Sequence, residues 1–393
     1  MSSDQWRILV KVTGYRSLIT HHDWGRRIGD VNHASETTST PVHALIVTTD
    51  EGIDGVGIGA HPDIERIFGA VAGEDPRGVV ALYDRMCAHV FKLGHQGAAA
   101  GTIGAIDMAL WDIKAKAAGE PLWRLLGGRD RFVPGYASAL DIALDDDELV
   151  AIHTKFAERG YRSAKLKGGR HLDRDIERLL LVRDIYSGQS AAPALMFDAN
   201  EAWHRSQAIR YVVKLEEKID LAWIEEPVRR WDAAGLAAVR AGVRAGVASG
   251  ENLTGLEQFR PLLDAEALDV VQVGWGWGTT LALRVAAAAH ARDLPVSPVG
   301  FWPAIAPAAA AMPNMISLEV QDLTYPYGIG VDQEIVDGGI VLGDEAGHGL
   351  SVDEDAISSL AVDSAWRTPP NWQVRPARAG LRLTPEDDSD LDH

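Results

Sequence analysis

Three carboxylates recur along this chain at nearly equal intervals, each near the end of a short string of apolar or small residues. Asp198 lies in MFDAN, Glu225 in WIEEP and Glu251 in SGEN, so the acids are 27 and 26 residues apart. That interval is typical of one strand–helix unit in a (β/α) barrel, in which reactive groups lie at the carboxyl ends of the strands. Because Mg²⁺ prefers hard oxygen ligands, the spacing predicts a divalent-metal site made by these three acids. Mn²⁺ also suits this ligand set.

Two lysines precede the acids by about one further unit, in the string AKLKGG. Side chains alternate along a strand, so Lys165 and Lys167 should share one face while Leu166 packs on the other. An amine opposite a metal can act as a base if its pKa falls below the ordinary value near 10.4. We expect the neighbouring positive charges and partial burial to lower the pKa of Lys167.

The same alternation gives each acid a direction. Asp198 and Asn200 should point together toward the barrel axis, whereas only one of Glu225 and Glu226 can do so in a regular strand. We assign Glu225 to the metal and Glu226 to a supporting role. A single acid at a strand end is usually a solvated surface charge. Three acids and two lysines in phase on successive strands favour a functional cluster instead.

The composition narrows the class of protein. The 393 residues are 46% hydrophobic with a formal net charge of −18. This length suits a barrel plus a smaller domain, and the charge argues against a nucleic-acid partner. The single cysteine, Cys87, cannot form an internal disulfide. The chain begins without the apolar core of a signal peptide and has no apolar run long enough for a bilayer. We therefore expect a cytoplasmic location and no membrane partner.

The pattern of apolar residues divides the chain into parts. Residues 1–130 predict an α+β domain, and residues 131–320 alternate between strands and helices. Short β-rich pieces in 321–380 are expected to return to the first domain, and the acidic residues 381–393 to be disordered. Eight strand ends predict a closed α/β barrel. They fall near Ser138, Lys167, Asn200, Glu225, Glu251, Val273, Pro298 and Glu319.

Together these motifs resemble the enolase superfamily, in its mandelate racemase/muconate lactonizing enzyme type. The helix TIGAIDMALWDIKAK and then Lys-x-Lys, Asp-x-Asn, Glu-Glu-Pro and Gly-Glu-Asn occur in family order over nearly the whole chain. A glutamate at position 251 resembles the mandelate racemase subgroup. The resemblance implies a modified TIM barrel under an α+β N-terminal capping domain, Mg²⁺, a small carboxylate substrate and a homo-oligomer, either a dimer or an octamer. It also implies that Lys167 is the base and that Lys165 contacts the substrate carboxylate.

Glu319 follows Ile-Ser-Leu at the end of the last predicted strand. In the mandelate racemase group a glutamate here donates a hydrogen bond to the developing enolate when it is protonated. Burial would raise the pKa of Glu319 toward that role. A structural ion pair is the competing interpretation.

The chain departs from the family pattern opposite the lysines. Many members of the subgroup carry an aspartate at the end of the sixth strand and a histidine at the end of the seventh, where this chain has Gly274 and Val299. Racemisation needs a second group on that face and is not expected. Substitute acids could come from loops, where His204, His21 and His22 are candidates.

Aromatic residues take the place of the missing pair, and Trp275 and Trp302 are predicted to line the substrate. Packing between loops and the other domain is the alternative. Residues 20–39 have no consistent apolar period and are predicted to form a long loop. The resemblance implies that residues 20–35 of this loop form a lid over the barrel mouth. We expect His22 and Arg26 from this lid, together with Asn200, to contact substrate, with Arg26 suited to a second carboxylate.

We therefore predict a Mg²⁺-dependent lyase or isomerase that abstracts the α-proton of a carboxylate. Dehydration of an acid sugar fits a single lysine base with a leaving group on the same side. The first alternative is a cycloisomerase that opens a sugar-acid lactone. The alternative from another class is a metal-binding or ligand-binding relative without turnover.

Overall fold

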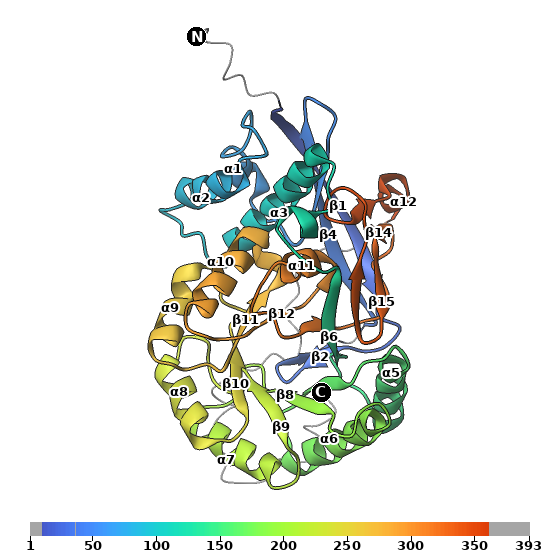
Figure 1. The fold of residues 1–393 in the computed structure, drawn as a ribbon, viewed down its shortest axis with the longest axis vertical. Helices are drawn as coiled ribbons and strands as arrows, with labels where there is room; N and C mark the ends of the chain where they lie inside the picture. Colours follow the sequence, from blue (N-terminus) through green and yellow to red (C-terminus); the bar gives the residue numbers. More distant parts are fainter. Residues whose placement is uncertain (1–9, 36, 361–393) are drawn as a thin grey trace.

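The structure is a computed structural model that describes residues 10–35 and 37–360. The predicted acidic tail, 381–393, lies outside the described residues. The described chain forms a cap, at the top of Figure 1, and a barrel below it. None of the helices in the described ranges combines the length and apolar character needed to cross a membrane.

The cap is built on a three-stranded antiparallel sheet in the order β1–β4–β5, against which the long helix α3 (Ala98–Ala118) packs. A Cβ added at Gly57 would lie 2.0 Å from the carbonyl oxygen of Ala105, so glycine is what lets strand and helix approach so closely. The other elements of the cap are β1 (Val12–Asp23), β2 (Gly29–Asp30), β3 (His33–Ala34), β4 (Ser39–Thr49), β5 (Gly55–Ile58), α1 (Ile64–Phe68), α2 (Val79–His89) and α4 (Leu122–Leu125).

The loop predicted over residues 20–39 is wrong at both ends, because β1 and β4 form a long ribbon there. The antiparallel register runs through Thr20↔Val42 and His22↔Thr40 to Asp23↔Ser39. Between the strands, β2 and β3 pair as a short ladder. The apolar period is weak because the residues that this end of β1 buries, Thr20 and His22, are polar.

The barrel has eight parallel strands, and its sheet runs from β12 back through β11, β10, β9, β8, β7 and β6 to β13. It closes beside β12, where the Val296 amide donates to the Asn314 carbonyl at 2.9 Å and the Ile316 amide donates to the Val296 carbonyl at 3.0 Å. The predicted fold class is therefore confirmed. The strands are β6 (Phe132–Ser138), β7 (Ser163–Lys167), β8 (Ala194–Asp198), β9 (Leu221–Glu225), β10 (Gly246–Ser249), β11 (Val270–Gly274), β12 (Val296–Val299) and β13 (Leu318–Val320).

Helices follow the strands and form the outer ring seen in Figure 1. They are α5 (Asp146–Glu158), α6 (Leu172–Ser187), α7 (Arg205–Glu216), α8 (Ala233–Gly242), α9 (Leu256–Asp264), α10 (Thr279–His290) and α11 (Trp302–Ala309), with the short 3₁₀ helix η2 (Trp275–Trp277) after β11.

Alternation along the strands separates an inner and an outer face, as expected. Leu166 and Phe197 belong to the large apolar core of the molecule, on the side of the strands away from the axis. A separate small cluster fills the barrel interior, and it contains Tyr136, Met196 and Trp223. The lysines and acids of the predicted site are the next inward-pointing residues toward the carboxyl ends of the strands.

The segment after β13 lies against both parts of the molecule. The β15–β16 hairpin joins the start of β6 through the pair Val133↔Ile340. The β14–β17 pair and α12 pack on the cap, and Arg16 forms an ion pair with Glu354 at 2.7 Å. These elements, red in Figure 1, are β14 (Ile329–Val331), β15 (Gln333–Val336), β16 (Gly339–Leu342), β17 (Leu350–Val352) and α12 (Glu354–Ser358).

Candidate active site

The two predicted lysines meet three of the predicted acids inside the barrel mouth. Lys165 is fully buried, and its Nζ lies 2.5 Å from Glu225 Oε1, 2.8 Å from Glu319 Oε1 and 3.5 Å from Asp198 Oδ2. The Nζ of Lys167 lies 2.5 Å from Asp198 Oδ2. Residues from β7, β8, β9 and β13 therefore form one ionic cluster, as the strand parity predicted.

A second, unpredicted group holds the backbone of Lys167. Asp141 Oδ1 accepts from the Lys167 amide at 3.0 Å, and an Nη of Arg178 donates to the Lys167 carbonyl at 2.8 Å. Arg178 also donates to Asp141 Oδ1 at 3.0 Å, and His153 Nε2 lies 3.3 Å from Asp141 Oδ2. Burial opposes the charge on Asp141, but Arg178 and His153 outweigh it and lower its pKa to about 2. Asp141 lies in a loop outside every motif, so only the fold reveals this contact.

Glu251 reaches the site from beyond its strand. The strand β10 ends at Ser249, and Gly250 follows with φ +132°, so the direction of Glu251 depends on this turn and not on strand parity. The side-chain amide of Asn252 donates to Glu251 Oε1 and Glu226 Oε1, both at 3.0 Å. This shared donor holds Glu226 beside Glu251, in agreement with a supporting role for Glu226.

The donor set carries an excess of negative charge, which suits a cation. If all were ionised, the five acids of this cluster would outnumber its two ammonium groups, Lys165 and Lys167; the acids are Asp198, Glu225, Glu226, Glu251 and Glu319. Burial, and then the nearby charge of Asp198, raise the pKa of Glu225 to about 8. Burial also raises the pKa of Glu251 and, more strongly, that of Glu226.

The carboxylates turn toward the lysines and are not already gathered around a metal position. Across residues 10–35 and 37–360, no three histidine, cysteine, aspartate or glutamate side chains are grouped as metal ligands. Asp198 and Glu225 instead each contact an ammonium group. The residues fit a hard divalent ion by chemistry and by charge, since their oxygens are the ligands that Mg²⁺ prefers.

The pKa values of Lys167 and Glu319 shift here in the direction opposite to the expected one, because Lys167 pairs with Asp198 and Glu319 pairs with Lys165. Burial opposes the charge on Lys167, but Asp198 outweighs it, so the pKa of Lys167 is raised instead of lowered. Burial likewise opposes the charge on Glu319, but Lys165 and then Lys167 outweigh it and lower the pKa of Glu319. Glu319 thus forms the ion pair that was the competing interpretation. Its other oxygen, Oε2, accepts from the Gly300 amide at 2.7 Å and from Gln321 Nε2 at 3.0 Å.

On the opposite side of the barrel mouth, β11 and β12 carry no ionisable side chain, and their buried polar side chains are Gln272 and Ser297. The strands β11 and β12 end at Gly274 and Val299, neither of which can transfer a proton. Trp275 follows β11, and Gly300 follows β12 with φ +99°. A Cβ at Gly300 would lie 2.0 Å from Cδ1 of Trp275, so the glycine is what allows the indole to lie against this turn.

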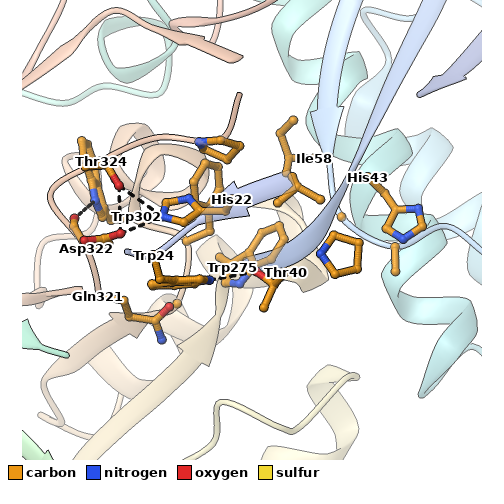
Figure 2. Close-up of a pocket in the computed structure, with 17 residues that line it drawn as sticks. His22, Trp24, Thr40, His43, Ile58, Trp275, Trp302, Gln321, Asp322 and Thr324 are labelled. Carbon is orange, nitrogen blue, oxygen red and sulfur yellow. Dashed lines mark hydrogen bonds and ion pairs between the residues drawn. The ribbon is translucent and has the colours of Figure 1, made fainter. Parts of the chain in front are cut away.

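The predicted substrate-contacting residues fall into two groups. His22, Trp275 and Trp302 line one cavity of about 280 Å³, drawn in Figure 2. Arg26 and Asn200 do not line it.

An Nη of Arg26 donates to the Gln321 carbonyl at 3.1 Å, while its Nε and other Nη are buried without a partner, and burial lowers the pKa of Arg26. The carbonyl of Asn200 accepts from Asn32, and its side-chain oxygen is buried without a partner.

The three histidines considered as substitute acids differ in their surroundings. His204 is exposed at the start of α7, and His21 is partly buried and stacks on Tyr327 at 5.8 Å between ring centroids. His22 is 4% exposed, and its Nε2 lies 2.7 Å from Asp322 Oδ2. The sequence pointed to His22 but not to Asp322, which lies 300 residues away and just beyond the last barrel strand.

Comparisons with known proteins agree with this architecture. The family model for the mandelate racemase/muconate lactonizing enzyme N-terminal domain matches residues 17–127, and the enolase C-terminal domain-like model matches residues 148–356. The 3,6-anhydro-α-L-galactonate cycloisomerase of Streptomyces coelicolor is 32% identical over 300 residues, which are 75% of this chain and 81% of that protein. The L-talarate/galactarate dehydratase of Salmonella typhimurium is 34% identical over 266 residues, which are 63% of this chain and 65% of that protein. A crystal structure of a racemase from Streptomyces coelicolor with bound magnesium has a TM-score of 0.82 and 27% identity, and the match covers 89% of this chain and all of that one.

The structure is a closed barrel under an α+β cap, with buried lysines and acids at the carboxyl ends of the strands. These features define a (β/α)-barrel enzyme that works by acid–base catalysis. The chain belongs to the enolase superfamily, in its mandelate racemase/muconate lactonizing enzyme group. The predicted family is confirmed, as is the prediction of a lyase or isomerase.

Proposed function

We propose that this enzyme removes the α-proton of a sugar acid with Lys167 and then expels the β-hydroxyl group, so that it acts as a Mg²⁺-dependent acid-sugar dehydratase. The observation that carries the proposal is the buried cluster in which two lysines from β7 face acids from β8, β9 and β13. The acids outnumber the ammonium groups, so a divalent ion on Asp198, Glu225 and Glu251 would neutralise negative charge that the lysines do not. Such an ion, when bound, would stabilise the negative charge that develops on the substrate carboxylate.

The chain's own groups have distinct tasks in this proposal. The Nζ of Lys167 is paired with Asp198 in this structure. It would take the proton from the carbon next to the carboxylate when a divalent ion held by Asp198 offsets that carboxylate's charge and so lowers the pKa of the lysine. The Nζ of Lys165 donates to a carboxylate oxygen of the substrate, and Glu319 keeps that ammonium group in position from 2.8 Å. Preorganised charges of this kind act where negative charge develops in the transition state.

The absence of an ionisable side chain on β11 and β12 favours elimination over racemisation. Gly274 and Val299 offer no group that could return a proton to the other face of the α-carbon. The proton that Lys167 removes can be returned to a β-oxygen on the same side, which then leaves as water, or as a hydroxyl group of the product when a ring opens, so no second acid or base is needed. We therefore expect sugar acid recovered from the reaction to keep its configuration at the α-carbon.

A cycloisomerase is the second candidate, and two of the relatives favour it. The relative named 3,6-anhydro-α-L-galactonate cycloisomerase is 32% identical over 75% of this chain, and one named D-galactarolactone cycloisomerase is 27% identical over 90% of it. An anhydro sugar acid carries an ether oxygen at the β-carbon, so the same proton abstraction would open the ring without loss of water. Ring opening of a sugar-acid lactone is the related reaction predicted from the sequence.

Deuterium exchange separates these reactions. The protein is incubated with Mg²⁺ in D₂O and a panel of sugar acids, anhydro sugar acids and lactones, and the α-proton is followed by NMR with mass detection of products. A mass decrease by one water identifies the dehydratase, and a product of unchanged mass identifies the cycloisomerase. If no compound exchanges its α-proton, the proposal fails and a non-catalytic binding protein is the better description.

The last part of the proposal concerns the oligomeric state of the enzyme and its cellular compartment. We infer a homo-oligomer in the cytoplasm, on the family to which the chain belongs. Size-exclusion chromatography with light scattering measures the assembly, and a monomer at micromolar concentration would contradict it.

A further inference from the structure

One arginine connects the loops that follow β8, β9 and β10. These three strands are neighbours in the barrel (Figure 1), and each carries or directly precedes one of the acids assigned to the metal. Arg230 belongs to the loop after β9. Its Nε lies 2.5 Å from Glu201 Oε1 in the loop after β8, and an Nη donates to the Asn252 carbonyl at 3.1 Å in the loop after β10. One guanidinium group therefore spans all three loops.

Asn252 extends this contact to the acids. Its carbonyl accepts from Arg230, while its side-chain amide donates to Glu251 Oε1 and to Glu226 Oε1, both at 3.0 Å. Two neighbouring carboxylates repel each other, and a shared donor offsets that repulsion. A shift of the Asn252 backbone would therefore take the donor away from both acids.

The backbone next to Arg230 has an unusual conformation. Glu201 and Glu226 have φ angles of +61° and +42°, in the left-handed region that residues with a side chain rarely adopt. The Glu201 amide donates to the Glu226 carbonyl at 2.7 Å, so these two residues hold each other. Such a conformation persists only where surrounding contacts fix it. The ion pair between the buried Glu201 carboxylate and Arg230 is one such contact.

Glu251 depends on these loop contacts more than the other two predicted ligands do. Asp198 and Glu225 are the last residues of their strands, and each pairs with a lysine ammonium group. Glu251 lies beyond the end of β10, and its carboxylate accepts from Asn252. Hydrogen bonds from outside the ligand set orient the ligands of metal sites. Arg230 and Asn252 can supply that orientation for Glu251.

We propose that Arg230 is a positioning residue of the metal site, and that through Asn252 it holds Glu251 in the direction that a divalent ion needs. This inference rests on the proposed function, because it takes Asp198, Glu225 and Glu251 as the ligands. Arginine suits the task better than lysine does, because its planar group donates in two fixed directions at once.

Mg²⁺ alone tests this role, so no substrate has to be known. Calorimetry compares the unaltered protein with Arg230→Ala and Arg240→Ala. Arg240 is the matched control, because its Nε pairs with Asp269 at 2.8 Å and an Nη donates to the Glu266 carbonyl at 3.2 Å, but beside the start of β11. We expect Arg230→Ala to weaken Mg²⁺ binding about tenfold and Arg240→Ala to change it by less than about twofold.

A double-mutant cycle tests whether Arg230 acts through Asn252. Asn252→Ala should weaken Mg²⁺ binding at least as much as Arg230→Ala does, and the double variant should bind no more weakly than Asn252→Ala alone. Arg230→Lys protects the test against a folding defect. It keeps a positive charge beside Glu201 but loses one donor direction, so it should still weaken Mg²⁺ binding by about threefold.

Thermal melting without metal shows which variants fold, and Arg230→Lys replaces Arg230→Ala in both comparisons if the alanine variant does not melt cooperatively. Mg²⁺ binding as tight as that of Arg240→Ala would overturn the positioning role and leave the metal site standing. Simple addition of the Arg230 and Asn252 effects would do the same. If the unaltered protein bound no Mg²⁺, the proposed function would fail as well.

Discussion

The two sides of the barrel mouth are built on the same strand geometry but carry opposite chemistry. On the side of β7, β8, β9 and β13, buried lysines and acids contact one another at distances from 2.5 to 3.5 Å. On the side of β11 and β12, the strands end in Gly274 and Val299 and the next side chain is an indole. Position in the fold alone therefore does not determine where charge is found.

The difference follows from the cost of burying charge. A buried ionised group is stable only when partners surround it, so charges inside a barrel occur in groups and not singly. Every charged group of the first side has a neighbour of opposite sign or a hydrogen-bond donor, whereas a side chain at position 274 would meet the Glu251 carbonyl and Trp277.

The largest expected effect tests the charged side directly. Lys167→Ala should lower the rate of α-proton exchange by about 10³-fold or more, because it removes the base, while Mg²⁺ affinity stays within a few-fold. Exchange is measured by NMR in D₂O and Mg²⁺ binding by calorimetry. Lys214→Ala is the matched control, since Lys214 is an exposed lysine on α7 that pairs with Glu217. If Lys167→Ala exchanged the proton as fast as this control, Lys167 would not be the base.

Mg²⁺ binding should also depend on the charged side of the barrel mouth. A substitution there should have the second-largest effect. Asp198→Asn removes a charged ligand and is expected to weaken Mg²⁺ binding by about 10- to 100-fold, with activity that added Mg²⁺ restores only in part. Chelation of the metal should abolish exchange in the unaltered enzyme. Asp220→Asn, at an exposed position before β9, serves as control. Unchanged affinity in Asp198→Asn would remove this residue from the ligand set.

The charged side was also the part that the sequence predicted best. Lys165, Lys167, Asp198 and Glu225 come from strands, and the period of two relates their directions without knowledge of the rest of the fold. Their pKa values could not be obtained in this way, because they depend on which carboxylate is nearest to each ammonium group. The lowered pKa of Glu319 and the raised pKa of Lys167 both follow from such contacts.

Contacts between distant segments were beyond the sequence argument. Asp322 meets His22 across 300 residues, and Asp141 meets the Lys167 backbone from a loop. Neither acid belongs to a motif, and their local sequence is that of any polar loop. The β1–β4 ribbon was missed for the same reason: its partner strand, and not its own apolar pattern, defines it.

Asp141 and Arg178 hold the Lys167 backbone, and removing the charge of Asp141 should have an effect of intermediate size. Asp141→Asn leaves Arg178 and His153 beside a neutral amide and should lower the free energy of unfolding by about 3 kcal/mol. Since the base then moves more freely, kcat should fall about 10-fold with little change in KM. Denaturant unfolding and steady-state kinetics measure the two effects. Asp146→Asn, whose Arg174 partner lies on the protein surface, is the control and should change stability by less than about 1 kcal/mol.

The smallest expected effect tests whether Trp275, on the side of β11 and β12, contacts substrate or only packs the cap against the barrel. Gly300→Ala puts a Cβ where Trp275 now lies, at a residue with φ +99°, so it should cost about 1–3 kcal/mol of stability and displace the indole. If the indole is a wall for substrate, kcat/KM should fall several-fold through KM, while Mg²⁺ affinity stays unchanged. Gly276→Ala is the matched control, because a Cβ there has no neighbour within 4 Å. Equal kinetics in the two variants would mean that Trp275 only packs the cap against the barrel, and that the charged side alone makes the site.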